Sequence, residues 1–98
     1  MSGPTHSLTI RATIPARIGM LGEVMAAIAA EDALVGGVDI VRSASESVTR
    51  DVAVLVRDDA HGERVRIAIA QVADVEVEGV ADRALLAHAG GKVGMRNR

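Results

Sequence analysis

The fold of this chain is decided by residues 8–30, which have the sequence LTIRATIPARIGMLGEVMAAIAA. The first part alternates apolar and polar side chains from Leu8 to Ile14, the period of a β-strand with one buried face. Pro15 removes a backbone donor and ends the strand, and Gly19 permits a tight turn. The second part predicts an amphipathic helix, because apolar side chains recur at helical spacing. This apolar stripe comprises Leu21, Val24, Met25, Ile28 and Ala29.

The rest of the sequence predicts two strands, a second helix and a last strand. Val35-Gly36-Gly37 is expected to break the pattern before a strand over residues 38–42, and a polar turn leads to a strand over residues 48–57. Asp58 and Asp59 suit the positive N-terminal end of the second helix. We expect that helix to bury Val65, Ala68, Ile69 and Val72, to leave Ile67 off the stripe, and to expose His61, Glu63, Arg64 and Gln71. The last strand is expected around residues 75–79.

This order of elements predicts an α+β fold of the ferredoxin-like βαββαβ type. Such a sandwich has a four-stranded antiparallel sheet with two helices on one face and the first and third strands in the centre. The third strand contains the unbroken apolar run Val52-Ala53-Val54-Leu55-Val56, which indicates cover on both faces. The second cover is then expected from another chain or domain; the alternative is that Ala53 and Leu55 are simply exposed.

The chain of 98 residues is long enough for one small domain. We assign residues 1–6 to a disordered N-terminal tail, residues 7–82 to the domain and residues 83–98 to a C-terminal extension or linker.

Composition limits the possible functions. The net charge of −2 and the absence of aromatic residues disfavour a nucleic-acid partner, and the absence of cysteine excludes disulfides and thiolate metal sites. No signal peptide is apparent, and the apolar segment from Met20 to Ala30 is too short to span a bilayer. We therefore expect a soluble cytoplasmic protein with no membrane partner.

No catalytic arrangement is visible. His6, His61 and His88 are far apart and are expected on the surface, and nothing near them has the spacing of a metal site. Gly90-Gly91-Lys92 lacks the spacing of a phosphate-binding loop and is expected to be a linker. We predict no catalytic residue and no metal ligand in this chain.

The turn from the first strand into the first helix is the one candidate ligand site. Its residues are Ala16, Arg17, Ile18, Gly19, Met20 and Leu21. The first amides of a helix have no internal partners and, with the helix dipole, attract a carboxylate. The alternative is an ordinary strand–helix turn without a ligand.

The segment Ile14-Pro15-Ala16-Arg17-Ile18-Gly19-Met20-Leu21-Gly22 resembles the start of ACT domains. Those domains typically have a strand, then Arg-Pro-Gly-Met/Leu-Leu, then the helix. This chain has Ile18 where that pattern usually has proline, a change that loosens the turn but keeps the glycine and the helix start.

Further segments resemble the N-terminal regulatory ACT segment of bacterial NAD(P)-dependent malic enzymes. The resemblance spans about residues 7 to 95. It rests on Gly37–Arg42, Val48–Asp51, His61–Arg64, Val80–Arg83 and His88–Lys92.

The resemblance implies a division of labour between this chain and a catalytic region that it does not contain. That region would decarboxylate malate oxidatively with NAD(P) and a divalent metal, so the chain itself is expected to hold no cofactor and to be no enzyme. ACT domains also pair and bind small effectors, often amino acids, near the first turn and a subunit interface. This nominates residues 16–21, with Asp39 facing the interface where many relatives have Asn. Asp39 would repel a carboxylate but attract an ammonium group. The resulting expectation is a regulatory, dimerising domain; the alternative is a ligand-free oligomerisation module.

Overall fold

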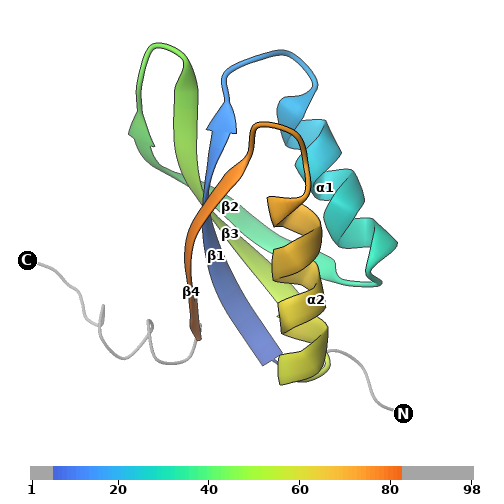
Figure 1. Cartoon of the computed structure of the whole chain (residues 1–98). Coiled ribbons are helices and arrows are strands. Elements are labelled where there is room, and N and C mark those ends of the chain that lie inside the picture. The colour runs from blue at the N-terminus through green and yellow to red at the C-terminus, as the bar shows by residue number, and fades with distance from the viewer. Residues whose placement is uncertain (1–5, 83–98) are drawn as a thin grey trace, which may run out of the picture.

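A computed structural model describes residues 6–82, in which strands and helices follow one another in the βαββαβ order that the sequence predicts (Figure 1). The predictions for residues 1–5 and 83–98, which include His88 and Gly90-Gly91-Lys92, concern segments outside the described residues. The elements are β1 (His6–Pro15), α1 (Met20–Ala30), β2 (Leu34–Ser43), β3 (Ser47–Val56), α2 (Asp59–Ala70) and β4 (Glu76–Asp82).

The strands form one antiparallel sheet in the order β2-β3-β1-β4. Helices α1 and α2 lie side by side over one face of this sheet (Figure 1). We call the opposite side of the sheet the open face. The ferredoxin-like α+β prediction is confirmed, with β1 and β3 as the central strands.

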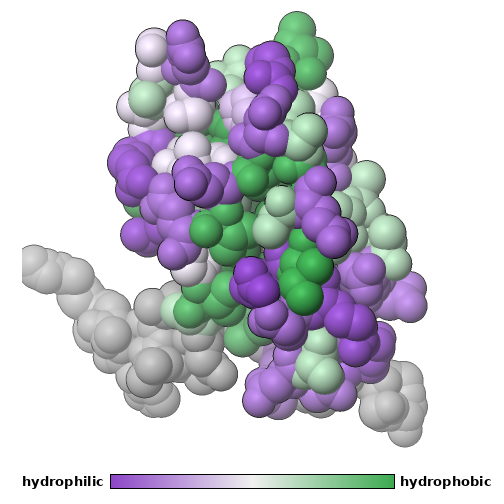
Figure 2. All heavy atoms as spheres, viewed as in Figure 1, coloured by the Kyte–Doolittle hydropathy of each residue, from purple (hydrophilic) through white to green (hydrophobic). Residues whose placement is uncertain are grey.

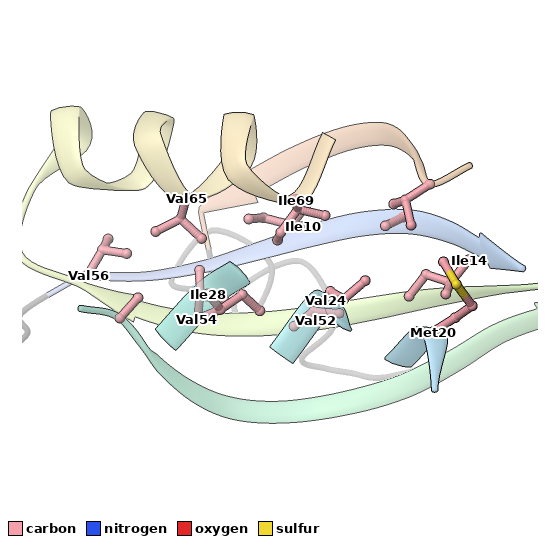
Figure 3. Close-up of a cluster of buried hydrophobic side chains, with 13 residues drawn as sticks. Ile10, Ile14, Met20, Val24, Ile28, Val52, Val54, Val56, Val65 and Ile69 are labelled. Atoms are coloured by element: carbon pink, nitrogen blue, oxygen red, sulfur yellow. The ribbon is translucent and has the colours of Figure 1, made fainter. Parts of the chain in front are cut away.

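The core lies between the sheet and the two helices (Figure 3). Alternate residues of β1 and β3 point toward the helices. They pack against one apolar stripe of α1 and one of α2. Aliphatic side chains and Met20 fill this core, and burial of each large one contributes about 1.5–3 kcal/mol. Its labelled members are Ile10, Ile14, Met20, Val24, Ile28, Val52, Val54, Val56, Val65 and Ile69.

The helical stripes agree with the sequence pattern at their centres and differ at their margins. Val24 and Ile28 are buried, whereas Ala29, expected on the stripe of α1, is exposed. On α2, Ile67 is exposed as expected.

The surface seen in Figure 2 has a narrow band of hydrophobic residues between hydrophilic ones rather than a broad apolar patch. Within residues 6–82, no helix has the length and apolarity needed to cross a membrane.

Strand β2 begins earlier than the sequence indicates. The Val35-Gly36-Gly37 segment, expected to precede the strand, lies inside it, and the pairing with β3 shifts register between Val35 and Gly37. A bulge of this kind accepts an extra residue in an antiparallel pair, and glycine accommodates it easily. The strand therefore begins at Leu34 and not at Val38 as the sequence predicts, because its pairing with β3 continues through the glycines across the bulge.

The apolar run on β3 is only partly covered on the open face. Ala53 is buried and Leu55 is half-buried, although both point away from the core. A second covering chain or domain therefore remains a prediction.

The expectation that His61 faces solvent was wrong. His61 is fully buried, and its ring joins α2 to the end of α1. The Arg57 N–H donates to His61 Nδ1 at 3.0 Å, so the ring proton is on Nε2, which donates to the Glu31 carbonyl at 2.5 Å. A buried imidazole is stable here because both ring nitrogens have partners.

Asp58 caps α2, as the sequence predicts. Its Oδ1 accepts the His61 N–H at 2.8 Å, and this hydrogen bond lowers the pKa of the Asp58 carboxyl below its ordinary value. The ionised carboxylate also lies at the positive end of the helix dipole.

We predict that His61→Phe lowers the free energy of unfolding by about 1–3 kcal/mol, because the backbone groups of Arg57 and Glu31 lose buried hydrogen bonds to the ring. Chemical denaturation followed by far-UV circular dichroism would measure the loss. The control is His6→Phe at an exposed histidine, where a change within about 0.5 kcal/mol is expected. Equal effects of the two substitutions would contradict the role assigned to His61.

We predict that the Asp58 cap makes α2 sensitive to acid. The pKa of Asp58 is lowered in the folded chain, so its stabilising effect is fully present above the unfolded pKa and is lost as pH falls through the folded pKa. Asp58→Asn keeps a capping side chain without the charge. The melting temperature of the native protein should exceed that of this variant at neutral pH, and the two should converge in strong acid. A difference that does not change with pH would contradict this assignment.

Candidate functional site

The candidate site is the turn that joins β1 to α1. The Ala16 N–H donates to the Glu46 carbonyl at 3.0 Å, which ties the turn to the hairpin between β2 and β3. Gly19 follows with φ of 90°, a left-handed conformation that side chains disfavour. The glycine thus turns the chain sharply into the helix.

No side chain of residues 6–82 caps the N-terminus of α1. Gly19 occupies the N-cap position and offers no acceptor, whereas Asp58 caps α2 with its carboxylate. The Met20 N–H reaches the Arg17 carbonyl at 3.2 Å. The next amides of the first turn have no carbonyl within the helix to bond, so this end of α1 favours an external acceptor.

A cavity of about 320 Å³ lies beside this turn and extends to β3. Its wall combines aliphatic side chains with the guanidinium groups of Arg17 and Arg50. The lining residues are Ile14, Pro15, Ala16, Arg17, Ile18, Leu21, Val48 and Arg50.

The two arginines of the cavity differ in their partners. Arg17 Nη2 donates to Asp74 Oδ2 at 3.1 Å and lies 3.7 Å from Met20 Sδ. Arg50 forms no ion pair with any other residue in the described part of the chain. The cavity therefore has an excess of positive charge, to which the N-terminus of α1 adds.

The structure brings together part of the predicted site. Ala16, Arg17, Ile18 and Leu21 line the cavity, and Ile18 is fully exposed. Gly19 forms the cap, but Met20 is buried in the core at 5% exposure.

Asp39 lies apart from the other predicted site residues. It is exposed on β2 and pairs in register with Asp51, on the open face of the sheet. Ile14 and Val48, which line the cavity, belong to the opposite face. Asp39 therefore does not contribute to this cavity within one chain.

Sequence reasoning missed Val48 and Arg50 as parts of the site. The β1–β3 register places Val48 opposite Ile14 and Arg50 opposite Ala12. No local signal marks either residue, because their proximity to the turn depends on pairing between strands distant in sequence.

Among residues 6–82, no three histidine, aspartate or glutamate side chains gather closely enough to hold a metal ion.

Comparison with known proteins gives one partial similarity. No protein-family model matches the sequence. The chain is 28% identical to an NAD-dependent malic enzyme of Geobacillus stearothermophilus over 91 residues, which make up 93% of this chain and 19% of that enzyme. The chain therefore spans less than a fifth of the relative's length.

Proposed function

We propose that this chain is an ACT-type regulatory domain of a malic enzyme. It binds a small carboxylate effector of the amino-acid type beside the β1–α1 turn and pairs with a second copy through β2. The catalytic region, with NAD(P) and a divalent metal, would lie outside this chain. The similarity to a malic enzyme over 93% of the chain supports this placement.

The observation that carries the proposal is the cavity at the turn. The uncapped start of α1 offers N–H groups without partners in the helix, and the cavity of about 320 Å³ beside it offers space for a ligand. A volume of this size lies within the ordinary range of small-molecule sites. The expected coupling between such a site and a distant catalytic centre is about 1–3 kcal/mol.

The lining indicates which ligand fits. A carboxylate would meet Arg50 and the first amides of α1, both of which favour negative charge. The aliphatic residues Ile14, Val48 and Leu21 would contact an apolar side chain. Among the described residues that line the cavity there is no carboxylate to repel the carboxylate of such a ligand, and Asp39 lies on the other face of the sheet.

Strand β2 supports the pairing part of the proposal. It is an edge strand of ten residues, and every one of them except Val38 is exposed. An uncovered edge with apolar side chains favours association with another chain. The exposed large aliphatic residues of β2 are Leu34, Val35, Ile40 and Val41.

Two bulges shape this edge. The β2–β3 register shifts between Val35 and Gly37 and again between Ile40 and Arg42. Bulges interrupt the regular ladder, so aliphatic contacts are expected to contribute more to pairing than a long run of backbone hydrogen bonds. Asp39 lies between the bulges and would come close to the second copy.

We predict that one member of a panel of apolar amino acids, malate and acetyl-CoA raises the melting temperature of the chain. A ligand at 100 times its dissociation constant adds about 2.7 kcal/mol, which corresponds to about 10 °C or more for a domain of this size. Far-UV circular dichroism is the suitable measurement, because the chain contains no aromatic residue. A flat panel would contradict effector binding and favour the ligand-free oligomerisation module.

Arg50→Gln provides the specific test of the cavity. The substitution should lower the affinity for the compound that raises the melting temperature by about tenfold, because it removes a charge-assisted contact. Arg66→Gln is the matched control, since Arg66 lies on α2 and pairs with Glu63 outside the cavity. Equal loss of affinity in both variants would place the ligand elsewhere.

We predict that Ile40→Lys weakens self-association by about tenfold or more, because the exposed isoleucine of β2 would become a charge at the paired edge. Sedimentation equilibrium measures the change in dissociation constant. The control is Ile67→Lys on α2, which alters a comparable exposed isoleucine away from β2. A native chain that stays monomeric at every concentration would contradict pairing.

A further inference from the structure

The open face of the sheet carries a row of small residues that crosses all four strands. Thr9 on β1 pairs with Ala53 on β3 and with Ala81 on β4. Ala53 in turn pairs with Gly37 on β2. We call Gly37, Ala53, Thr9 and Ala81 the small-residue row. Adjacent strands are about 4.8 Å apart, so a row across four strands is about 14 Å long.

Larger side chains border this row. Leu55 on β3 and Leu34 on β2 pair with each other on one side of it. On the other side Arg11 donates to both carboxylate oxygens of Asp51 at 2.8 and 2.9 Å. A cavity of about 410 Å³ extends from this ion pair to the β4 end of the row and shares no residue with the cavity at the β1–α1 turn. At that end, the row is therefore the floor of a hollow.

Two members of the row are buried although they point away from the helices. Ala53 is 6% exposed and Thr9 is 7% exposed. The Thr9 Oγ1 atom has no hydrogen-bond partner among the described residues. A buried hydroxyl without a partner costs free energy, and native structures rarely leave one in this state. The row therefore favours an occupant that brings a polar atom as well as apolar surface.

The chain itself continues from one end of the row. Ala81 is the β4 member of the row, and β4 ends one residue later at Asp82. Residues 83–98 follow, and this segment includes the apolar run Ala84-Leu85-Leu86-Ala87. A fully extended chain covers about 3.5 Å per residue, so Leu86 can reach any point of the row from Ala81.

The charges of this segment and of the open face are complementary. The segment contains basic residues and no acidic one; the basic residues are Arg83, Lys92, Arg96 and Arg98. On the described part of the open face, carboxylates outnumber guanidinium groups. Arg11 pairs with Asp51 and Arg42 with Glu78. Asp39 and Glu76 on the same face have no ion pair with a described residue. Opposite charges favour association of two such surfaces.

We propose that residues 83–98 pack across the open face of the same chain and cover the small-residue row. Leu85 and Leu86 would contact the row and Leu55. A polar group of the segment would bond the Thr9 hydroxyl. The cover of the apolar run on β3 would then come from this chain and not from a second copy. This packing does not depend on an effector at the β1–α1 turn, because the sheet separates the two places.

A spin label in the segment tests this packing in the full chain by NMR. The chain has no cysteine, so His88→Cys provides a single attachment site for a nitroxide. In a ¹⁵N-labelled sample, the nitroxide should lower the signal intensity of the Thr9 and Ala53 amides relative to the reduced, diamagnetic label. The same label on a chain with Leu85→Gln and Leu86→Gln should leave most of that intensity intact. An intensity loss that survives both substitutions, or no loss in either chain, would overturn the proposal.

A mixed sample distinguishes the segment from a second copy as the cover of the row. It contains ¹⁵N-labelled chain without the nitroxide and chain of natural isotope content with the nitroxide. The Thr9 and Ala53 amides should keep their intensity in this sample, since each chain covers its own sheet. An intensity loss equal to that of the singly prepared sample would assign the cover to a second copy and refute the proposal.

Thermal unfolding of the full chain tests the contact between the segment and Leu55. Leu55→Gln should lower the melting temperature by about 4 °C or more, and so should the double variant Leu85→Gln with Leu86→Gln, because each removes buried aliphatic surface. The three substitutions combined should lower it by less than the sum, since they remove the same contact. Ile67→Gln is the matched control at an exposed isoleucine of α2, and its shift should add to that of the double variant. Additive shifts for Leu55 and the segment would contradict the assigned contact.

Discussion

The pairing of β1 with β3 is the constraint on which the rest of this structure depends. The two strands pair without a register shift from His6 opposite Val56 to Pro15 opposite Ser47. Because side chains alternate along a strand, this one register decides which residues face the helices and which form the open face. A slip by one residue would turn Ile10 and Val54 outward and bring Arg11 and Asp51 into the core.

The two faces produced by this register have different chemistry. The helix face is aliphatic, and at its end near the β1–α1 turn it opens into a cavity with Arg17 and Arg50. The open face carries a band of polar contacts that reaches from Arg42 on β2 to Glu78 on β4. The sheet itself therefore separates the cavity at the β1–α1 turn from the polar contacts of the open face.

Helix ends supply the second level of organisation. The Asp58 carboxylate accepts the His61 N–H at the start of α2, and the His61 ring bonds the Glu31 carbonyl at the end of α1. The start of α2 therefore has its partners within the fold. At the start of α1 the N-cap is Gly19, and no side chain in the described part of the chain accepts a hydrogen bond from its first turn. The two helix starts therefore differ in hydrogen bonding: the Asp58 carboxylate accepts an N–H of the first turn of α2, whereas no described side chain accepts one at the start of α1.

The sequence by itself determined the order of elements, the fold class and the centres of the core, because hydrophobic periods of two and about 3.6 residues are local properties. The sequence also nominated residues 16–21, since a glycine turn before a helix is a local signal, and it nominated Asp39 through the family resemblance. Only the tertiary structure decided that His61 is buried, that β2 continues through Gly36 and Gly37, and that Arg50 joins the turn. These features depend on which distant segments meet, and the register of β1 against β3 fixes that only when the sheet forms.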